Sequence, residues 1–315
     1  MLRPEPDVTV ELDADVLALA HSPVGDELAL GCRGDILLAD PVSLQVRRRW
    51  TADPRRVRQL VYHCDGTRLA SAGFDGMVCW WDTETGASVA ELAGHEGRVW
   101  AVDVVPGGAT LVSSGGDHSV RLWRQDTAPL VLRGHGAPVR SVAFSLDGAL
   151  VASGAEDREI RIWDAGTGHG LGVLTGHSGK VRCLSWYPDG TLLSGSSDGT
   201  LRWWDVRAGR QLHLVQAHGT GRTGKIRALT RSSDHRLVLT GSEDGTARLW
   251  TGDGKRLLAE LCAAGTGDTA GTEAAAVTAV SISRTGTRAV TASSDGVVRG
   301  WPLVTGVGTG GPHPV

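Results

Sequence analysis

The chain has 315 residues, of which 41% are apolar, and a formal net charge of −3 at pH 7. This length and composition predict a globular protein with a large core. The small negative charge excludes a surface built as a whole to hold a nucleic-acid backbone or an anionic bilayer, although local basic patches remain open.

Several other classes are not expected. The first fifteen residues lack a basic stretch followed by an apolar one, and no run of 18 apolar residues occurs in the sequence. We therefore expect no signal peptide and no membrane span, in a cytoplasmic protein. The cysteines are odd in number, widely spaced and without a Cys-x-x-Cys pair: Cys32, Cys64, Cys79, Cys183 and Cys262. Reduced, buried thiols are expected, with no metal site and no cofactor.

The first predicted element is a strand at residues 8–12, VTVEL, which matches VAEL at 89–92. A repeated unit then begins near residue 16. In six copies a Ser or Thr is followed four residues later by Asp, and that Asp six residues later by Trp, as in SGAEDREIRIWD at 153–164. The Trp residues are spaced by 42, 40, 41, 46 and 51 residues: Trp81, Trp123, Trp163, Trp204, Trp250 and Trp301. A seventh, degenerate copy at 31–40 has Arg33 in the Asp position and Ala39 in the Trp position.

Each unit contains short apolar runs rich in β-forming residues, separated by turn residues. In the unit at 139–164 they read VRSVAF, LDG, ALVAS, EDRE and IRIWD. Asp-Gly pairs at 65–66, 147–148 and 189–190 stand where a tight turn needs a positive φ. The pattern predicts antiparallel strands, and no helical period is long enough to compete.

Gly-His pairs at 94–95, 134–135 and 176–177 separate units, with Ala217-His218 as a near match, and several units end in Trp-Asp. With these motifs the chain resembles the WD-repeat, or β-transducin-like, propeller family from residue 8 to about 303. The resemblance implies an all-β, seven-bladed β-propeller of four-stranded antiparallel blades. After Trp301 the sequence PLVTGVGTGGPHPV cannot supply an outer strand. We therefore expect the strand at 8–12 to join the last blade and close the ring.

The whole chain, 1–315, is predicted to form one propeller domain with a flexible tail at 304–315. The expected blades span roughly 16–50, 57–92, 99–132, 139–174, 181–215, 226–261 and 277–303.

The resemblance also implies that His, Ser or Thr, Asp and Trp form a buried hydrogen-bonded set in each blade. Complete sets are expected at His95, Ser113, Asp117, Trp123; His135, Ser153, Asp157, Trp163; His177, Ser194, Asp198, Trp204; and His218, Thr240, Asp244, Trp250. Asp53 and Glu273 replace the His in blades two and seven, and blade one has no set. We therefore expect opening to begin at the seam between blades seven and one. No G-x-S-x-G, P-loop or H-E-x-x-H motif is present, so an enzyme is not expected.

Family resemblance places partner binding on the top face, at two positions per blade that flank the first apolar residue of the first strand. Eight of these fourteen positions are basic, whereas an even distribution of the 32 Lys and Arg would place about one or two there. The predicted partner-binding residues are Arg56, Arg58, Arg98, Trp100, Arg140, Lys180, Arg182, Lys225 and Arg227. We call the eight basic ones the basic arc, because all of them lie in blades two to six.

The leading hypothesis is a non-catalytic scaffold, a monomeric propeller within a complex, which binds an acidic or phosphorylated peptide or loop through this arc. Trp100 is expected to act as an aromatic anchor. Glu156 and Glu243, each directly before the Asp of its repeat, are expected to pair with the arc and neutralise part of it. The alternative is binding of nucleic acid or another polyanion, and a third hypothesis, disfavoured, is an enzyme at the channel mouth. Insertions at 219–224 and 263–276 are read either as closing over a partner or as solvated loops.

Overall fold

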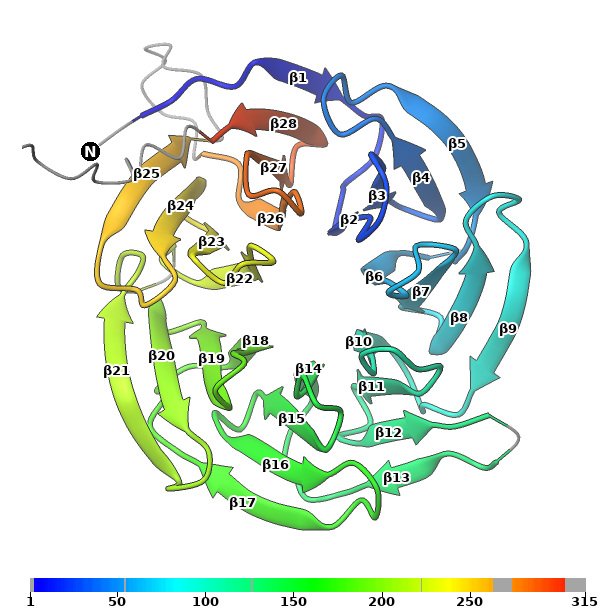
Figure 1. Ribbon diagram of the computed structural model, residues 1–315, viewed down its shortest axis with the longest axis vertical. Helices are drawn as coiled ribbons and strands as arrows, with labels where there is room; N and C mark the ends of the chain where they lie inside the picture. Colours follow the sequence, from blue (N-terminus) through cyan, green and yellow to red (C-terminus); the bar gives the residue numbers. More distant parts are fainter. Residues whose placement is uncertain (1–2, 54, 126, 222, 263–273, 304–315) are drawn as a thin grey trace, which may run out of the picture.

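The computed structural model describes residues 3–53, 55–125, 127–221, 223–262 and 274–303. In these residues, 28 strands form seven four-stranded antiparallel sheets. The sheets are arranged as blades around a central channel, with the first strand of each blade innermost (Figure 1). The predicted all-β, seven-bladed propeller is confirmed.

Blade one contains β2 (Ala18–His21), β3 (Leu28–Gly31), β4 (Asp35–Ala39) and β5 (Val46–Thr51). Blade two contains β6 (Val57–Tyr62), β7 (Arg68–Gly73), β8 (Met77–Asp82) and β9 (Ser88–Ala93). Blade three contains β10 (Val99–Val104), β11 (Leu111–Gly115), β12 (Val120–Trp123) and β13 (Leu130–Leu132). Blade four contains β14 (Val139–Phe144), β15 (Leu150–Ala155), β16 (Ile160–Asp164) and β17 (Gly170–Leu174).

Blade five contains β18 (Val181–Trp186), β19 (Thr191–Ser196), β20 (Thr200–Asp205) and β21 (Arg210–Gln216). Blade six contains β22 (Ile226–Arg231), β23 (Leu237–Ser242), β24 (Thr246–Thr251) and β25 (Leu257–Cys262). Blade seven combines β26 (Val277–Ile282), β27 (Arg288–Ser293) and β28 (Val297–Pro302) with β1 (Val8–Glu11). Because β1 pairs antiparallel with β28, from Val8 opposite Gly300 to Glu11 opposite Val297, the N-terminal strand closes the ring as expected.

The turns between the first two strands of the blades follow the Asp-Gly prediction. Gly66, Gly148 and Gly190 have φ values of 72°, 71° and 84°, a region that favours glycine because it has no Cβ. The Asp side chain before the Gly caps the turn, as in Asp147, whose Oδ1 accepts the N–H of Ala149 at 3.0 Å.

The core lies between neighbouring blades. One cluster joins Val78 and Trp80 of blade two to Val99, Leu111 and Trp123 of blade three, and similar clusters occupy the other junctions. Each sheet is therefore apolar on both faces, which explains why the strands read as nearly continuous apolar runs.

The cysteines follow the expectation only in part. Cys32 and Cys79 are buried, whereas Cys64 lies exposed in the turn after β6, which contradicts the expectation that all thiols are buried. Cys183 is half-buried beside the channel. The side chain of Cys262 lies outside the described part of the structure.

The innermost strands of blades two to seven share an irregularity near their start. Each pairs its first residue with the second strand, omits the next residue from the ladder, and resumes one residue later. Such a β-bulge redirects the side chain of the omitted residue. The omitted residues are Arg58, Trp100, Arg140, Arg182, Arg227 and Thr278.

Arg288 of β27 fastens the seam where the ring closes. Its two Nη atoms donate to the two carboxylate oxygens of Asp7, each at 2.7 Å. Its Nε–H donates to Pro41 O at 2.7 Å and one Nη to Val42 O at 2.9 Å, both in blade one. The hydrogen bonds from Arg288 hold the pKa of Asp7 below its usual value of 3.8. One buried guanidinium therefore connects blade seven, the segment before β1, and blade one.

No helix long and apolar enough to cross a membrane occurs in the described residues. The expected tail at 304–315, most of the insertion at 263–276, and Glu273 lie outside them.

Candidate functional site

The Ser, His and Asp side chains that resemble a catalytic triad form the buried sets expected from the family. In blade three, His95 Nδ1 lies 3.0 Å from Asp117, His95 Nε2 lies 2.8 Å from Ser113 Oγ, and Trp123 Nε1 donates to the same Oγ at 2.8 Å. The three other complete sets repeat this arrangement around His135, His177 and His218.

The reactive atoms of these sets are not accessible to a substrate. An ionised Asp117 only accepts, so His95 Nδ1–H donates to it and Nε2 accepts the Ser113 hydroxyl. Burial would raise the pKa of Asp117, but His95, Ser119 and the Glu96 N–H outweigh it and lower the pKa. Burial also lowers the pKa of His95, which stays neutral at pH 7. Ser113 is 0% exposed, so its Oγ reaches no substrate.

The group His135, Asp157 and Glu159 is the one place, among the described residues, where three ligand-type atoms lie within 4.8 Å of one another. Both ring nitrogens of His135 are already occupied, by Asp157 and Ser153 at 2.8 Å each. This group therefore belongs to the structural set of blade four.

Blade two lacks a complete set, as predicted. Trp81 still donates to Ser71 at 2.8 Å, but buried Asp53 stands in place of the His and accepts from the N–H groups of Arg55 and Asp75. Burial, with the negative charge of Asp53, raises the pKa of Asp75. In blade seven the bond from Trp301 to Thr291 is kept at 2.9 Å.

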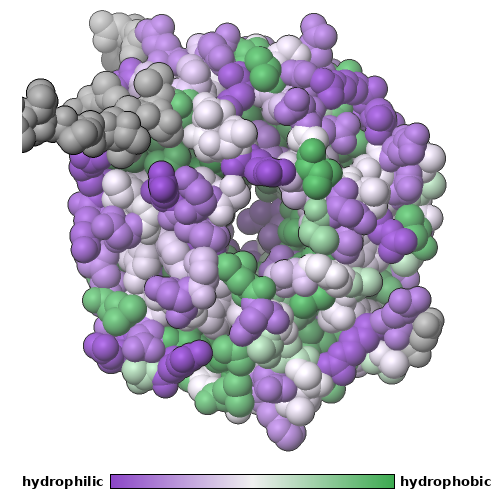
Figure 2. Space-filling view, viewed as in Figure 1, coloured by the Kyte–Doolittle hydropathy of each residue, from purple (hydrophilic) through white to green (hydrophobic). Residues whose placement is uncertain are grey.

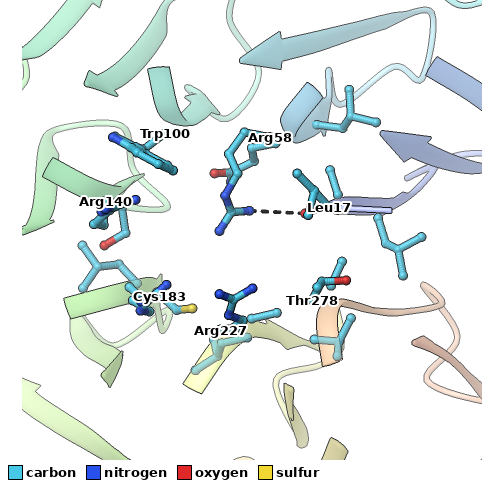
Figure 3. Close-up of a pocket in the computed structure, with 18 of the residues that line it drawn as sticks. Leu17, Arg58, Trp100, Arg140, Cys183, Arg227 and Thr278 are labelled. Atoms are coloured by element: carbon cyan, nitrogen blue, oxygen red, sulfur yellow. Dashed lines mark hydrogen bonds between the residues drawn. The ribbon is translucent and has the colours of Figure 1, made fainter. Parts of the chain in front are cut away.

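The bulged residues converge on one end of the central channel, which is open in the space-filling view and shows hydrophilic side chains within it (Figure 2). Five of the nine predicted site residues line a cavity of about 130 Å³ there: Arg58, Trp100, Arg140, Arg182 and Arg227. We call this cavity the upper mouth. Arg58 and Arg227 extend toward each other across it, with Trp100 beside Arg140 (Figure 3). Cys183 and Thr278 complete the wall, and no Asp or Glu of the described chain lines it.

Two glutamates neutralise part of the basic arc, as the sequence allowed. Glu156 accepts from Arg140 and from Lys180, and Glu243 accepts from Lys225 at 2.9 Å and Arg227 at 3.0 Å. Each glutamate thus pairs with two cations, so each group of one glutamate and two cations keeps a net charge of +1. Desolvation by burial would raise the pKa of Glu156, but Lys180 and Arg140 lower it.

Arg58 and Arg182 have no carboxylate partner among the described residues. Arg58 donates one Nη–H to Leu17 O at 3.2 Å, and Arg182 donates Nε–H to Ser197 Oγ at 2.7 Å. Burial, together with the neighbouring Arg182, Arg227 and Arg140, lowers the pKa of Arg58 to about 10, so it remains charged at neutral pH. These two are the arginines of the upper mouth that no carboxylate of the described chain pairs with.

The other four predicted residues do not line the upper mouth: Lys180 and Lys225 pair with the two glutamates, and Arg56 and Arg98 lie beside the cavity. Arg56 pairs with Asp15 at 3.2 Å, and the Arg98 guanidinium lies 4.8 Å from the ring centre of Phe74. Together with Arg33 and Arg55 these three residues line a second hollow, which we call the outer pocket.

Sequence reasoning missed Arg33, Arg55 and Phe74 as surface residues of this face. The replacement of the repeat's Asp by Arg33 was visible, but it was read only as degeneration of blade one. The Trp100 ring has two neighbours, the Arg140 guanidinium 3.5 Å from its centre and the Phe74 ring, whose centre lies 5.0 Å away.

Comparison with known families accounts for this repeat pattern. The profile described as "WD domain, G-beta repeat" matches residues 45–82, 86–124, 128–164, 168–205, 209–251 and 267–302, more than half of the chain. The chain belongs to this family. Each of the first five matches begins near the outer strand of one blade and ends near the third strand of the next. One WD repeat therefore spans parts of two blades. No match covers the three inner strands of blade one, where Arg33 and Ala39 replace the motif residues.

Similar curated proteins share about half of the chain. Eukaryotic translation initiation factor 3 subunit I of Aspergillus fumigatus is 29% identical over 183 residues, 52% of this chain and 54% of the relative. The same subunit of Scheffersomyces stipitis is 27% identical, with 52% of each chain covered. WD repeat-containing protein 1 of Xenopus tropicalis is 30% identical over 184 residues, 55% of this chain but 30% of the relative. The chain thus spans about half or less of the length of these relatives.

Proposed function

We propose that this WD-repeat propeller is a non-catalytic scaffold that binds an acidic segment of a partner protein on the face containing the upper mouth. The observation that carries the proposal is the positive charge of Arg58 and Arg182, which have no carboxylate partner among the described residues and adjoin a cavity whose described lining contains no carboxylate. Like charges held this close repel one another, and a bound anion relieves that repulsion. WD propellers typically serve as interaction platforms, which agrees with the burial of every Ser-His-Asp set.

The relatives support a role within a complex, since the matched curated proteins include a subunit of a translation initiation factor. We place this chain, by the same reasoning, in the cytoplasm as one propeller of a larger assembly. The outer pocket adds area to the binding face, because Phe74 offers an apolar surface between Arg33, Arg55 and Arg98.

Binding of nucleic acid is the competing function, and the extension of the basic surface to Arg33 and Arg55 favours testing it. A protein that neutralises several phosphates loses affinity log-linearly with salt, whereas an acidic peptide held by few ion pairs depends on salt less steeply. Titration of a labelled single-stranded oligonucleotide between 50 and 200 mM salt, a range over which about 300-fold is lost for six phosphate contacts, separates the two functions.

The scaffold proposal is tested by affinity capture from the source cell with quantitative mass spectrometry. We expect at least one protein to be retained by the wild type and lost in the double variant Arg98→Glu/Arg182→Glu. These positions are chosen because neither has a carboxylate partner in the described chain, so reversal breaks no ion pair seen there.

The matched control is Arg207→Glu/Arg256→Glu, which makes the same change of charge at two exposed positions that line neither pocket and have no carboxylate partner in the described chain. If the control variant lost the same proteins, the loss would be explained by the change in net charge alone and not by this face. Retention of all proteins by the Arg98/Arg182 variant would contradict binding through this face.

A further inference from the structure

Resting on the proposed function, we infer that the upper mouth holds one phosphate group, carried on a side chain of the partner protein, between Arg58 and Arg182. The partner segment then continues over the outer pocket, which lies on the same face. Phosphorylation of the partner would therefore control its binding.

The first argument is the number of free donors. A guanidinium carries five N–H bonds in a planar fork. Within the described residues Arg58 uses one of them, toward Leu17 O, and Arg182 uses one, toward Ser197 Oγ. The other N–H bonds of both residues adjoin a cavity whose described lining supplies no carboxylate. A phosphate offers three acceptor oxygens to such a set, and arginine forks bind phosphate in two-point contacts.

The second argument is charge. Glu156 and Glu243 form ion pairs with Arg140 and Arg227, whereas Arg58 and Arg182 have no carboxylate partner among the described residues. The two free arginines carry +2, and each glutamate with its two cations leaves one further positive charge beside them. A phosphate monoester carries about −1.5 to −2 at pH 7, so it offsets more of this excess than the single charge of a carboxylate does.

The third argument is size. The cavity of about 130 Å³ is several times the ~10–15 Å³ that one water needs, yet smaller than the roughly 300–1,000 Å³ of pockets that enclose whole small molecules. It accommodates the tip of a side chain rather than a folded peptide. The stacked Trp100 and Arg140 form a wall that stiffens one side, because the guanidinium lies 3.5 Å from the ring centre.

Isothermal titration calorimetry of the full chain at constant ionic strength tests the inference with four probes. They are the blocked tripeptide Gly-phosphoserine-Gly, the same peptide with Glu or with unmodified Ser at the centre, and inorganic phosphate. We expect the phosphoserine peptide to bind about tenfold or more tightly than the Glu peptide, since phosphate supplies the second charge and the third oxygen. Inorganic phosphate should bind more weakly than the phosphoserine peptide, whose backbone reaches the rim.

The double variant Arg58→Gln/Arg182→Gln should bind the phosphoserine and Glu peptides equally weakly, while Arg210→Gln/Arg236→Gln keeps the wild-type ratio. Equal affinity of the wild type for both peptides would overturn the inference, as would equal losses in both variants. If inorganic phosphate bound as tightly as the phosphoserine peptide, the inference that the phosphate is carried on a side chain of the partner would be overturned.

A second measurement needs no variant. Because the second pKa of a phosphate monoester is about 6, affinity for the phosphoserine peptide should rise between pH 5 and 7.5, while affinity for the Glu peptide stays level. Parallel profiles would contradict the inference. If the Arg98/Arg182 variant loses a captured partner while the tripeptides show no phosphate preference, the scaffold proposal stands and this inference fails. If the phosphoserine peptide is preferred but no captured protein is lost in the Arg98/Arg182 variant, the phosphate inference stands and the scaffold proposal fails.

Discussion

His95 in blade three and Asp53 in blade two occupy equivalent places. Both lie against a glycine of the second strand: a Cβ added at Gly115 would overlap His95 Nδ1, and one added at Gly73 would overlap Asp53 Oδ2. The His connects Ser and Asp through two hydrogen bonds, whereas Asp53 places a buried carboxylate beside half-buried Asp75, where partial burial and the charge of Asp53 raise the pKa of Asp75. One residue therefore changes a satisfied network into an electrostatically unfavourable one.

Asp53→His is expected to raise the free energy of unfolding by about 1 kcal/mol, because it restores a bridge between Ser71 and Asp75 and removes a like charge. Thermal or urea unfolding at pH 7 measures the change. The reciprocal control is His95→Asp, which should lower stability, since it breaks both bonds of an intact set. A decrease in stability with Asp53→His would show that the two sites are not interchangeable.

At the residue scale the resemblance to the WD-repeat family predicted the four complete sets, which it placed at positions where His, Ser or Thr, Asp and Trp recur in register. It could not predict how the arc is divided between paired and free cations. Glu156 was visible as a candidate partner, but its simultaneous contact with Arg140 and Lys180 joins two blades. Such a contact depends on the spacing of neighbouring inner strands, which no local pattern encodes.

At the scale of elements, the bulges in β6, β10, β14, β18 and β22 determine the site. Each removes one residue from the ladder and turns its side chain into the upper mouth, next to the channel. The strands themselves were predictable from apolar runs and Asp-Gly turns, but a bulge of one residue leaves no mark in such a pattern. The sequence therefore located the residues of the upper mouth but not the bulges that separate them from Arg56 and Arg98.

The sequence predicted the seam itself but not the contacts of Arg288 across it, since Arg288 looks like an ordinary strand residue. Arg288→Gln should lower the free energy of unfolding at pH 7 by about 1–3 kcal/mol; we discount the ion pair because Asp7 is partly exposed. The folded-state pKa of Asp7 lies below its usual 3.8, so its contribution is present above that pH and lost as pH falls through the folded pKa.

The difference in stability between wild type and Arg288→Gln should therefore shrink when unfolding is measured at pH 3 instead of pH 7. Arg47→Gln is the matched control, because Arg47 pairs with Asp40 on the exposed surface and contacts a single blade. A pH-independent difference would mean that Arg288 acts through the carbonyls of Pro41 and Val42 rather than through Asp7.

At the scale of the whole molecule, the blades are alike in topology but unequal in their internal bonds. Blades three to six have complete sets, blade two has a partial one, and the degenerate blade one adjoins the seam. Since each blade packs on its neighbours alone, a local deficit is not compensated by distant contacts.

Hydrogen exchange should therefore begin at the seam. In a time course followed by mass spectrometry, peptides from β1, β28 and β2 should exchange before those from β14 to β17, and Arg288→Gln should accelerate the first group only. If blade four exchanged first, the complete set around His135 would not be the stabilising feature described above.

The pairing of β1 with β28 also has a consequence for synthesis on the ribosome. Val8 meets Gly300, so β1 emerges almost three hundred residues before its partner. At roughly 5–20 residues per second this delay lasts about 15–60 s. Throughout that interval the nascent chain carries an unpaired strand with Val8 and Val10 available to other strand edges. The unpaired strand therefore stays exposed to other strand edges until the last blade is made, at the end of translation.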